Sequence, residues 1–96
     1  MKAVINGIFL AKTSYEFKDK QTGEQKDNYG YYFLVYESEE SYGLAKPQVV
    51  SIHVPKTESL KYADTLKIYD KCKVVMDVRK QYNGNVKTVP CDCIKA

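Results

Sequence analysis

Two kinds of side chain recur in this 96-residue sequence and together could bind a polyanion: tyrosine rings and basic side chains. The nine tyrosines offer flat faces on which nucleobases can stack, and the fifteen lysine and arginine residues can neutralise phosphates. Stacking on an aromatic platform is worth about 1 to 3 kcal/mol per base. We therefore predict a nucleic-acid-binding surface that draws on Tyr15, Lys18, Lys26, Tyr29, Tyr31, Tyr32, Lys73, Arg79, Lys80, Tyr82 and Lys87.

The basic residues are concentrated in the later part of the chain. Residues 1–60 carry seven basic and eight acidic side chains, whereas residues 61–87 carry seven basic and three acidic ones. We expect a polyanion to lie on this later part of the fold. Arg79 is the only arginine, and its guanidinium can both contact a phosphate and stack on a base. The alternative for each of these residues is a solubilising charge or a ring that merely fills a strand.

Other residues that could do chemistry are poorly placed for it. Cys72, Cys91 and Cys93 do not have the spacing of a zinc ribbon, so core packing is the favoured role for these thiols. His53 has no Ser or Cys nucleophile beside it in the sequence. The sequence thus predicts no catalytic residue, no bound metal and no cofactor, and hence a protein that is not an enzyme.

The stretch from Asp27 to Glu37 is the strand around which the rest is expected to be organised. It is dense in aromatic and β-branched residues, which favour strands. Side chains alternate between the two faces of a strand. One face therefore carries Tyr29, Tyr31, Phe33 and Val35, and the other carries Tyr32, Leu34 and Tyr36. We expect Phe33 and Val35 to be core and Tyr32 and Tyr36 to be available. Because both faces are apolar, the outer one is expected to meet a partner or ligand.

The remaining elements follow from alternation, caps and turn residues. Gly7 is the expected position of a kink in a long first strand, and a bulge at Gly30 would change which tyrosines face outward. Asn83, Gly84 and Asn85 predict a hairpin turn. The other predicted elements are strands over Lys2–Phe17, Gln48–Val54, Tyr69–Gln81 and Val86–Ile94, a helix over Lys56–Lys67 capped by Thr57, and loops over Asp19–Asn28 and Glu37–Pro47.

This order of elements predicts the fold class. Five strands with one short helix between the third and fourth are the order of the OB-fold, a partly open five-stranded Greek-key barrel. We therefore predict an all-β protein in which residues 1–96 form one OB-fold domain. An SH3-like barrel is the alternative, and it would lack the helix.

With this order in view, the chain resembles the small single-stranded-DNA-binding proteins of phages and mobile elements, such as the filamentous-phage gene V protein type. The resemblance rests on chain length, strand order, the tyrosine-rich strand over residues 28–36, the lysine-bearing first hairpin and the Asn-Gly-Asn turn. It implies DNA binding without catalysis, usually as a homodimer, during replication or transfer of a phage or mobile element. The acidic-tipped tail of the bacterial housekeeping type is not matched by the ending Cys-Asp-Cys-Ile-Lys-Ala, so recruitment through a tail is not expected.

Location and two alternative functions complete the sequence-based expectations. Three cysteines without a framework spacing favour a reducing compartment, and Asn6 and Gly7 argue against a signal peptide, so we expect the cytoplasm of a bacterium or phage-infected cell and no membrane. The expected partner is single-stranded DNA or RNA. The first alternative is a protein-interaction module that uses the spare face of the tyrosine strand, and the second is oligosaccharide binding by the same rings.

Overall fold

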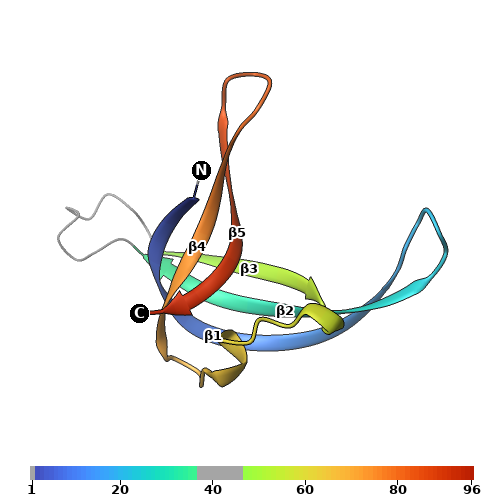
Figure 1. The fold of residues 1–96 in the computed structure, drawn as a ribbon, viewed down its shortest axis with the longest axis horizontal. Helices are drawn as coiled ribbons and strands as arrows, with labels where there is room; N and C mark the ends of the chain where they lie inside the picture. Colours follow the sequence, from blue (N-terminus) through green and yellow to red (C-terminus); the bar gives the residue numbers. More distant parts are fainter. Residues whose placement is uncertain (1, 37–46) are drawn as a thin grey trace.

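A single antiparallel β-sheet makes up the body of the protein (Figure 1). The computed structural model describes residues 2–36 and 47–96. The five strands are hydrogen-bonded in the order β3-β2-β1-β4-β5. The elements are β1 (Lys2–Lys18), β2 (Gln25–Tyr36), β3 (Gln48–Pro55), the 3-10 helices η1 (Lys56–Glu58) and η2 (Ala63–Thr65), β4 (Lys71–Lys80) and β5 (Val86–Lys95). The prediction of an all-β protein with five strands is confirmed, and the first loop is shorter than predicted, at residues 19–24.

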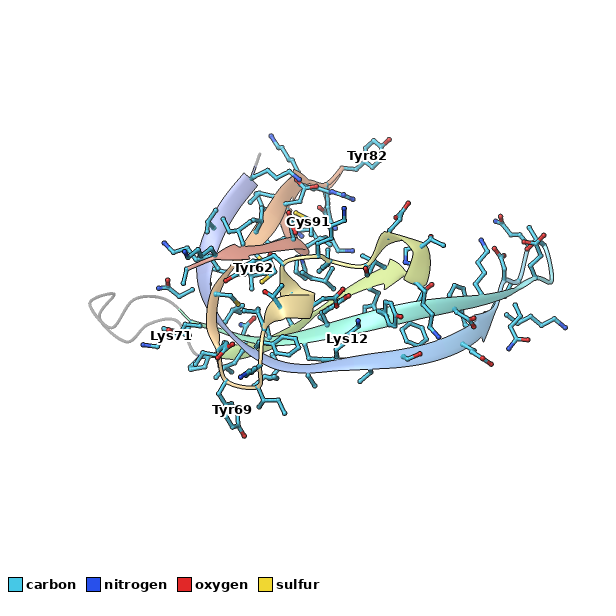
Figure 2. The ribbon with its side chains drawn as sticks, turned by 60° about the horizontal axis from the view of Figure 1, so that its bottom comes forward. Lys12, Tyr62, Tyr69, Lys71, Tyr82 and Cys91 are labelled. Carbon is cyan, nitrogen blue, oxygen red and sulfur yellow. The ribbon has the colours of Figure 1, made fainter. Side chains whose placement is uncertain are left out.

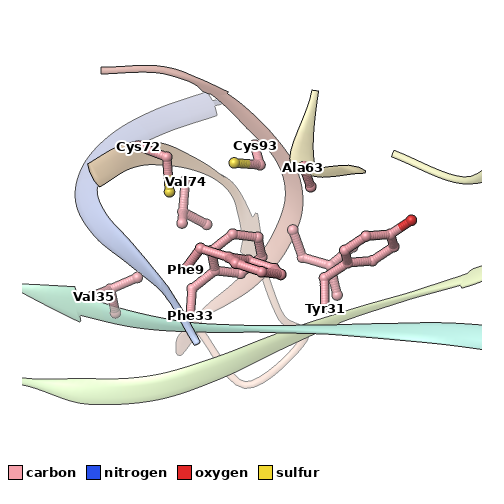
Figure 3. Close-up of a cluster of buried hydrophobic side chains, with 9 residues drawn as sticks. Phe9, Tyr31, Phe33, Val35, Ala63, Cys72, Val74 and Cys93 are labelled. Atoms are coloured by element: carbon pink, nitrogen blue, oxygen red, sulfur yellow. The ribbon is translucent and has the colours of Figure 1, made fainter. Parts of the chain in front are cut away.

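The core lies against one face of β2, as its alternating pattern predicts. Phe33 and Val35 are buried, which confirms their predicted role, and the Phe33 ring meets Phe9 of β1 edge to face at 5.7 Å between ring centroids. Cys72, Val74 and Cys93 cover these rings from β4 and β5 (Figure 3). The two buried cysteines therefore serve as small apolar core residues.

β1 is long because it pairs with two partners. Residues 2–8 pair with β4 and residues 6–18 with β2, apart from one irregularity between Phe9 and Ala11. The extra residue is Leu10, so the bulge lies three positions beyond Gly7, which pairs regularly with Val35 and Cys72. The bulge reverses which residues face inward along the rest of β1. Lys12 consequently lies opposite Tyr31, on the core side of the sheet.

The predicted helix over Lys56–Lys67 is not formed; two three-residue 3-10 helices, η1 and η2, stand in its place. Thr57 does not cap a helix, and Ser59 interrupts the segment with an extended ψ of 146°. An isolated helix of this length is marginal in water, so tertiary contacts decide the conformation. Here the Leu60 N–H donates a hydrogen bond to the Tyr31 hydroxyl at 3.2 Å. The predicted apolar residues of this segment still pack against the core: Leu60, Ala63 and Leu66.

The sheet curls until its two edge strands, β3 and β5, come into contact, although no backbone ladder joins them. Pro55 ends β3, as expected for an edge strand. Two long hairpins, β1–β2 and β4–β5, project from the sheet in different directions (Figure 1). Within the described part of the chain, no helix has the length and apolar character needed to cross a membrane. Residues 37–46 of the second predicted loop lie outside the described residues.

Candidate nucleic-acid interface

Four of the predicted binding residues lie together at the end of the β4–β5 hairpin. Arg79, Lys80, Tyr82 and Lys87 line one surface hollow of about 710 Å³, together with Gln81 and Asn83. The Tyr82 side chain is fully exposed and points away from the body of the protein (Figure 2). We refer to these six residues as the hairpin hollow. It combines cations and a free aromatic ring, the two features that single-strand binding requires.

The hairpin forms as its turn sequence predicts. Arg79 lies opposite Lys87 at the last regular pairs of β4 and β5. The turn is closed by the Gln81 N–H, which donates to the Asn85 carbonyl at 2.8 Å, and by the Asn85 N–H, which donates to the Asn83 side chain at 3.0 Å. Gly84 adopts a φ of 82°, which glycine reaches without strain. The turn therefore fixes the direction in which the neighbouring tyrosine is presented.

The charges in the hairpin hollow are only partly neutralised. Arg79 Nε donates to Asp77 Oδ2 at 2.8 Å, and this hydrogen bond lowers the pKa of the Asp77 carboxyl below its ordinary value. Within residues 2–36 and 47–96, neither Lys80 nor Lys87 makes a salt bridge. These two ammonium groups remain free to meet phosphates.

A second cluster lies on the outer face of the β1–β2–β3 part of the sheet and centres on His53, which sequence reasoning set aside as isolated. The His53 ring is bracketed by two hydroxyls: Tyr15 Oη lies 3.0 Å from Nδ1, and Ser51 Oγ lies 2.9 Å from Nε2. Asn28 Nδ2 donates to the same tyrosine hydroxyl at 3.3 Å. Gly30 leaves the space for this arrangement, because a Cβ there would lie 3.3 Å from the His53 ring and 2.9 Å from a threonine hydroxyl.

Aromatic rings surround His53 on this face. Tyr15 and Tyr32 meet it edge to face, with ring centroids at 5.6 and 6.1 Å, and Phe17 lies 6.2 Å from Tyr15. We refer to Tyr15, Phe17, Tyr32 and His53 as the His53 cluster. The alternation of residues along β1 and β2 was visible in the sequence, but the register that brings the third strand alongside was not. His53 therefore had no sequence signal beyond its position in a strand.

The ring of Tyr29 is already in contact with the ammonium groups of two lysines of the same protein. Lys12 Nζ lies 4.0 Å from the centroid of its ring, and Lys56 Nζ lies 5.6 Å from it. Lys12 is in turn held by Asp64 Oδ1 at 2.7 Å, a hydrogen bond that raises the pKa of the lysine. The Lys12–Asp64 ion pair and the contact of Lys56 with the Tyr29 ring tie the β3–β4 connection to the sheet. A base would have to displace Lys12 to stack on this ring.

The prediction that Tyr31 contributes to the binding surface is wrong, because its ring is completely buried in the core. Its hydroxyl donates to Asp64 Oδ1 at 2.8 Å and accepts from the Leu60 N–H at 3.2 Å. Burial, followed by the interaction with Asp64, raises the pKa of the Tyr31 phenol. The residue anchors the β3–β4 connection and cannot stack on a base.

Of the three remaining predicted residues, two lie near the tip of the β1–β2 hairpin and the third lies on β4. Lys26 forms an ion pair with Asp19 at 3.2 Å beside the β1–β2 loop. Lys18 lines a separate hollow of about 400 Å³ with Glu16 and Phe17. Lys73 lies half-buried on β4, between Asn6 and Ile94 of the neighbouring strands. The predicted residues thus lie on both hairpins and along the rest of β4 rather than on one surface.

Known proteins do not extend this description. No protein-family model, no curated protein and no solved structure matches the chain significantly.

Proposed function

We propose that this protein binds single-stranded DNA, largely independently of sequence and without catalysing a reaction, and that the hairpin hollow is its main contact. The observation that carries the proposal is the convergence of Arg79, Lys80, Tyr82 and Lys87 around one hollow. Three cations and an exposed ring match what a strand of phosphates and unpaired bases requires. RNA has the same phosphates and stacking faces, so competition between the two polymers decides the preference.

The shape of the sheet supports an OB-fold-like barrel as the scaffold. Five antiparallel strands whose edges β3 and β5 come into contact have the form of a partly open five-stranded barrel. In OB-folds, the loops of the first and last hairpins contribute to oligonucleotide binding. The β4–β5 hairpin is the last hairpin of this chain and carries the hollow. The biological role we propose is protection of transient single strands during replication or transfer of a phage or mobile element.

The test is binding of fluorescently labelled oligothymidine, followed by anisotropy as a function of salt. For an oligothymidine of about 4 nucleotides, which meets the hollow alone, three phosphate contacts predict a slope of log affinity against log salt near −2, so affinity should fall roughly 20-fold when the salt concentration rises fourfold. The variant Lys80→Gln/Lys87→Gln should bind more weakly and reduce the slope to about −0.7, because a single contact remains.

A matched control separates local contacts from net charge. Lys20→Gln/Lys61→Gln removes the same two charges from exposed lysines outside the hollow. It should leave both the affinity and the salt slope close to those of the wild type. Equal losses in the two double variants would show that only net charge matters, and absence of any anisotropy change at low salt would rule out DNA binding.

A protein-interaction module is the second candidate, favoured by the exposed aliphatic side chains Val4, Val49 and Ile94. Burial of such groups against a partner is driven by the hydrophobic effect and depends little on moderate salt. This function predicts a dimer in sedimentation equilibrium that resists salt and is disrupted by Val49→Glu. The same variant should have no effect on assembly if DNA binding is the function of a monomer.

A further inference from the structure

The outer face of β4 forms a row of side chains that begins at the hairpin hollow and ends at the opposite end of the strand. Alternation places Lys71, Lys73, Val75, Asp77 and Arg79 on this face. Lys71 lies opposite Ile8 of β1, and Lys73 opposite Asn6, without a bulge on β4. The row from residue 71 to residue 79 is roughly 26 Å long at the rise of an extended strand.

The far end of this row carries a second exposed tyrosine in an unusual conformation. Tyr69 has a φ of 72°, the only positive φ of a non-glycine residue in the described part of the chain, and 74% of its surface is exposed. Left-handed backbone is unfavourable for a side chain other than Gly, Asn or Asp. Because the ring is mostly exposed and the backbone disfavours tyrosine, packing of the ring cannot be the reason for tyrosine at this position. Figure 2 shows Tyr69 and Tyr82 pointing away from the body at opposite ends of the molecule.

The turn that holds Tyr69 is fixed by hydrogen bonds on both sides. The Tyr69 N–H donates to the Phe9 carbonyl at 2.7 Å, and the Phe9 N–H donates to the Asp70 carbonyl at 2.9 Å. Within the turn, the Asp70 N–H donates to the Lys67 carbonyl at 3.0 Å. The ring is thus presented by a preorganised segment, which reduces the entropy lost when a ligand stacks on it.

The charges along the row favour an anion. Lys71 and Lys73 form no salt bridge within the described residues. Within the row, three cations stand against one carboxylate, Asp77, which is paired with Arg79. Asp70 and Asp92 lie beside the row and keep their negative charge, because their hydrogen bonds come from the neutral backbone N–H groups of Lys67 and Cys93 at 2.8 and 2.7 Å. Two free ammonium groups thus lie between the two exposed rings.

We propose that a single strand of DNA lies along the outer face of β4, from Tyr82 at the hairpin to Tyr69 at the far turn. Bases stack on the two rings, and phosphates pass over Lys71 and Lys73. This inference rests on the proposed function and specifies the path and both of its ends. It also explains an exposed tyrosine at a backbone position that favours glycine.

The variant Tyr69→Gly tests the proposed path of the DNA without damage to the fold. Glycine adopts the observed φ without strain, and the removed ring is mostly exposed and so contributes little packing. Its melting temperature should equal or exceed that of the wild type. Affinity for an oligothymidine of about 16 nucleotides, which can reach both rings, should fall at least fivefold, as loss of one stacked base implies. Affinity for one of about 4 nucleotides, which is held at the hollow alone, should be unchanged.

A tryptophan probe gives an independent readout. Fluorescence of Tyr69→Trp should be quenched by the longer oligothymidine and not by the shorter one, whereas the control Val49→Trp, exposed on β3, should respond to neither. Quenching at Val49→Trp instead would move the strand to the β2–β3 face and overturn the path. If Tyr69→Gly changed the sedimentation of the DNA-free protein rather than its affinity for long DNA, the ring would be a protein contact and the proposal wrong.

Failure of this inference is distinguishable from failure of DNA binding itself. If Lys80→Gln/Lys87→Gln weakens oligothymidine binding while Tyr69→Gly leaves both lengths unaffected, the function stands and the β4 path is wrong. If no oligothymidine binds the wild type at low salt, the function and the path are both wrong.

Discussion

The two hairpins project from one sheet but hold their tyrosines in opposite ways. At the base of the β1–β2 hairpin, Tyr15 is hydrogen-bonded to His53, Tyr29 lies beneath Lys12, and Tyr31 is buried with its hydroxyl bonded to Asp64. At the tip of the β4–β5 hairpin, Tyr82 is fully exposed among cations. The comparison teaches that abundance of tyrosine does not by itself locate a stacking surface. The partners of each ring decide whether it supports the fold or is free for a ligand.

The largest expected difference between the two regions is in stability. Tyr31→Ala should lower the free energy of unfolding by about 3 to 5 kcal/mol, because it leaves a cavity in the core and removes the partner of Asp64. Tyr82→Ala should change it by less than about 0.5 kcal/mol. Urea denaturation followed by circular dichroism measures both values.

Tyr31→Phe divides the effect into its two parts. It keeps the ring and removes only the hydroxyl, so an intermediate loss of about 1 to 3 kcal/mol is expected. A loss as large as that of Tyr31→Ala would mean that the hydrogen bonds, and not the packing, hold the ring. If Tyr82→Ala lowered the free energy of unfolding as much as Tyr31→Ala, the proposed difference between the two regions would be contradicted.

The next difference concerns the carboxylates of the two regions as pH falls. Partial burial raises the pKa of Asp64, but hydrogen bonds from Lys12 and Tyr31 outweigh it, so the pKa lies below its ordinary value. A carboxyl with a lowered pKa in the folded state stabilises the protein above its unfolded pKa of about 4, and this contribution is lost as pH falls through the folded value. Asp64→Asn should therefore cost about 1 kcal/mol at neutral pH, and this cost should decrease as pH falls through the lowered pKa of Asp64 in the folded protein.

Asp77 provides the matched carboxyl in the other region. Its pKa is also lowered, by the hydrogen bond from Arg79 two residues away on the same strand. Because this pair links no separate elements, Asp77→Asn should change the unfolding free energy less than Asp64→Asn at neutral pH, and the difference should shrink as pH falls. Denaturation of both variants between about pH 2 and pH 7 tests this, and equal pH dependence would contradict it.

The features that were predictable from the sequence are those that depend on local alternation. Strand positions, the burial of Phe33 and Val35, and the turn at Gly84 follow from patterns of two to four residues. The Tyr31 error has a different origin, because alternation correctly put it on the face of Phe33 but could not reveal that η2 covers it. Alternation thus predicted which face of the strand is covered, but not how far along the strand the cover extends.

Long-range register explains the other differences from prediction. The bulge at Leu10 changes the facing of Lys12, and the pairing of β2 with β3 brings His53 to Tyr15. The 56–67 segment has helical spacing, yet contacts with Tyr31 favour 3-10 turns. The hairpin hollow could be predicted because its residues are close in sequence on either side of one turn.

The smallest expected difference between the two regions concerns the glycine in each hairpin loop, because here the two regions should behave alike. Gly23 and Gly84 have φ values of 71° and 82°, and a Cβ added at either would touch nothing within 4 Å. Gly→Ala should therefore cost only the backbone strain, about 1 to 2 kcal/mol at each site, and Gly→Asn should cost less because asparagine tolerates left-handed backbone. Urea denaturation of the four single variants measures this. A much larger loss for Gly84→Ala than for Gly23→Ala would show that the β4–β5 turn is held by contacts beyond its own backbone, and Tyr82 would then belong with the constrained tyrosines rather than with the free ones.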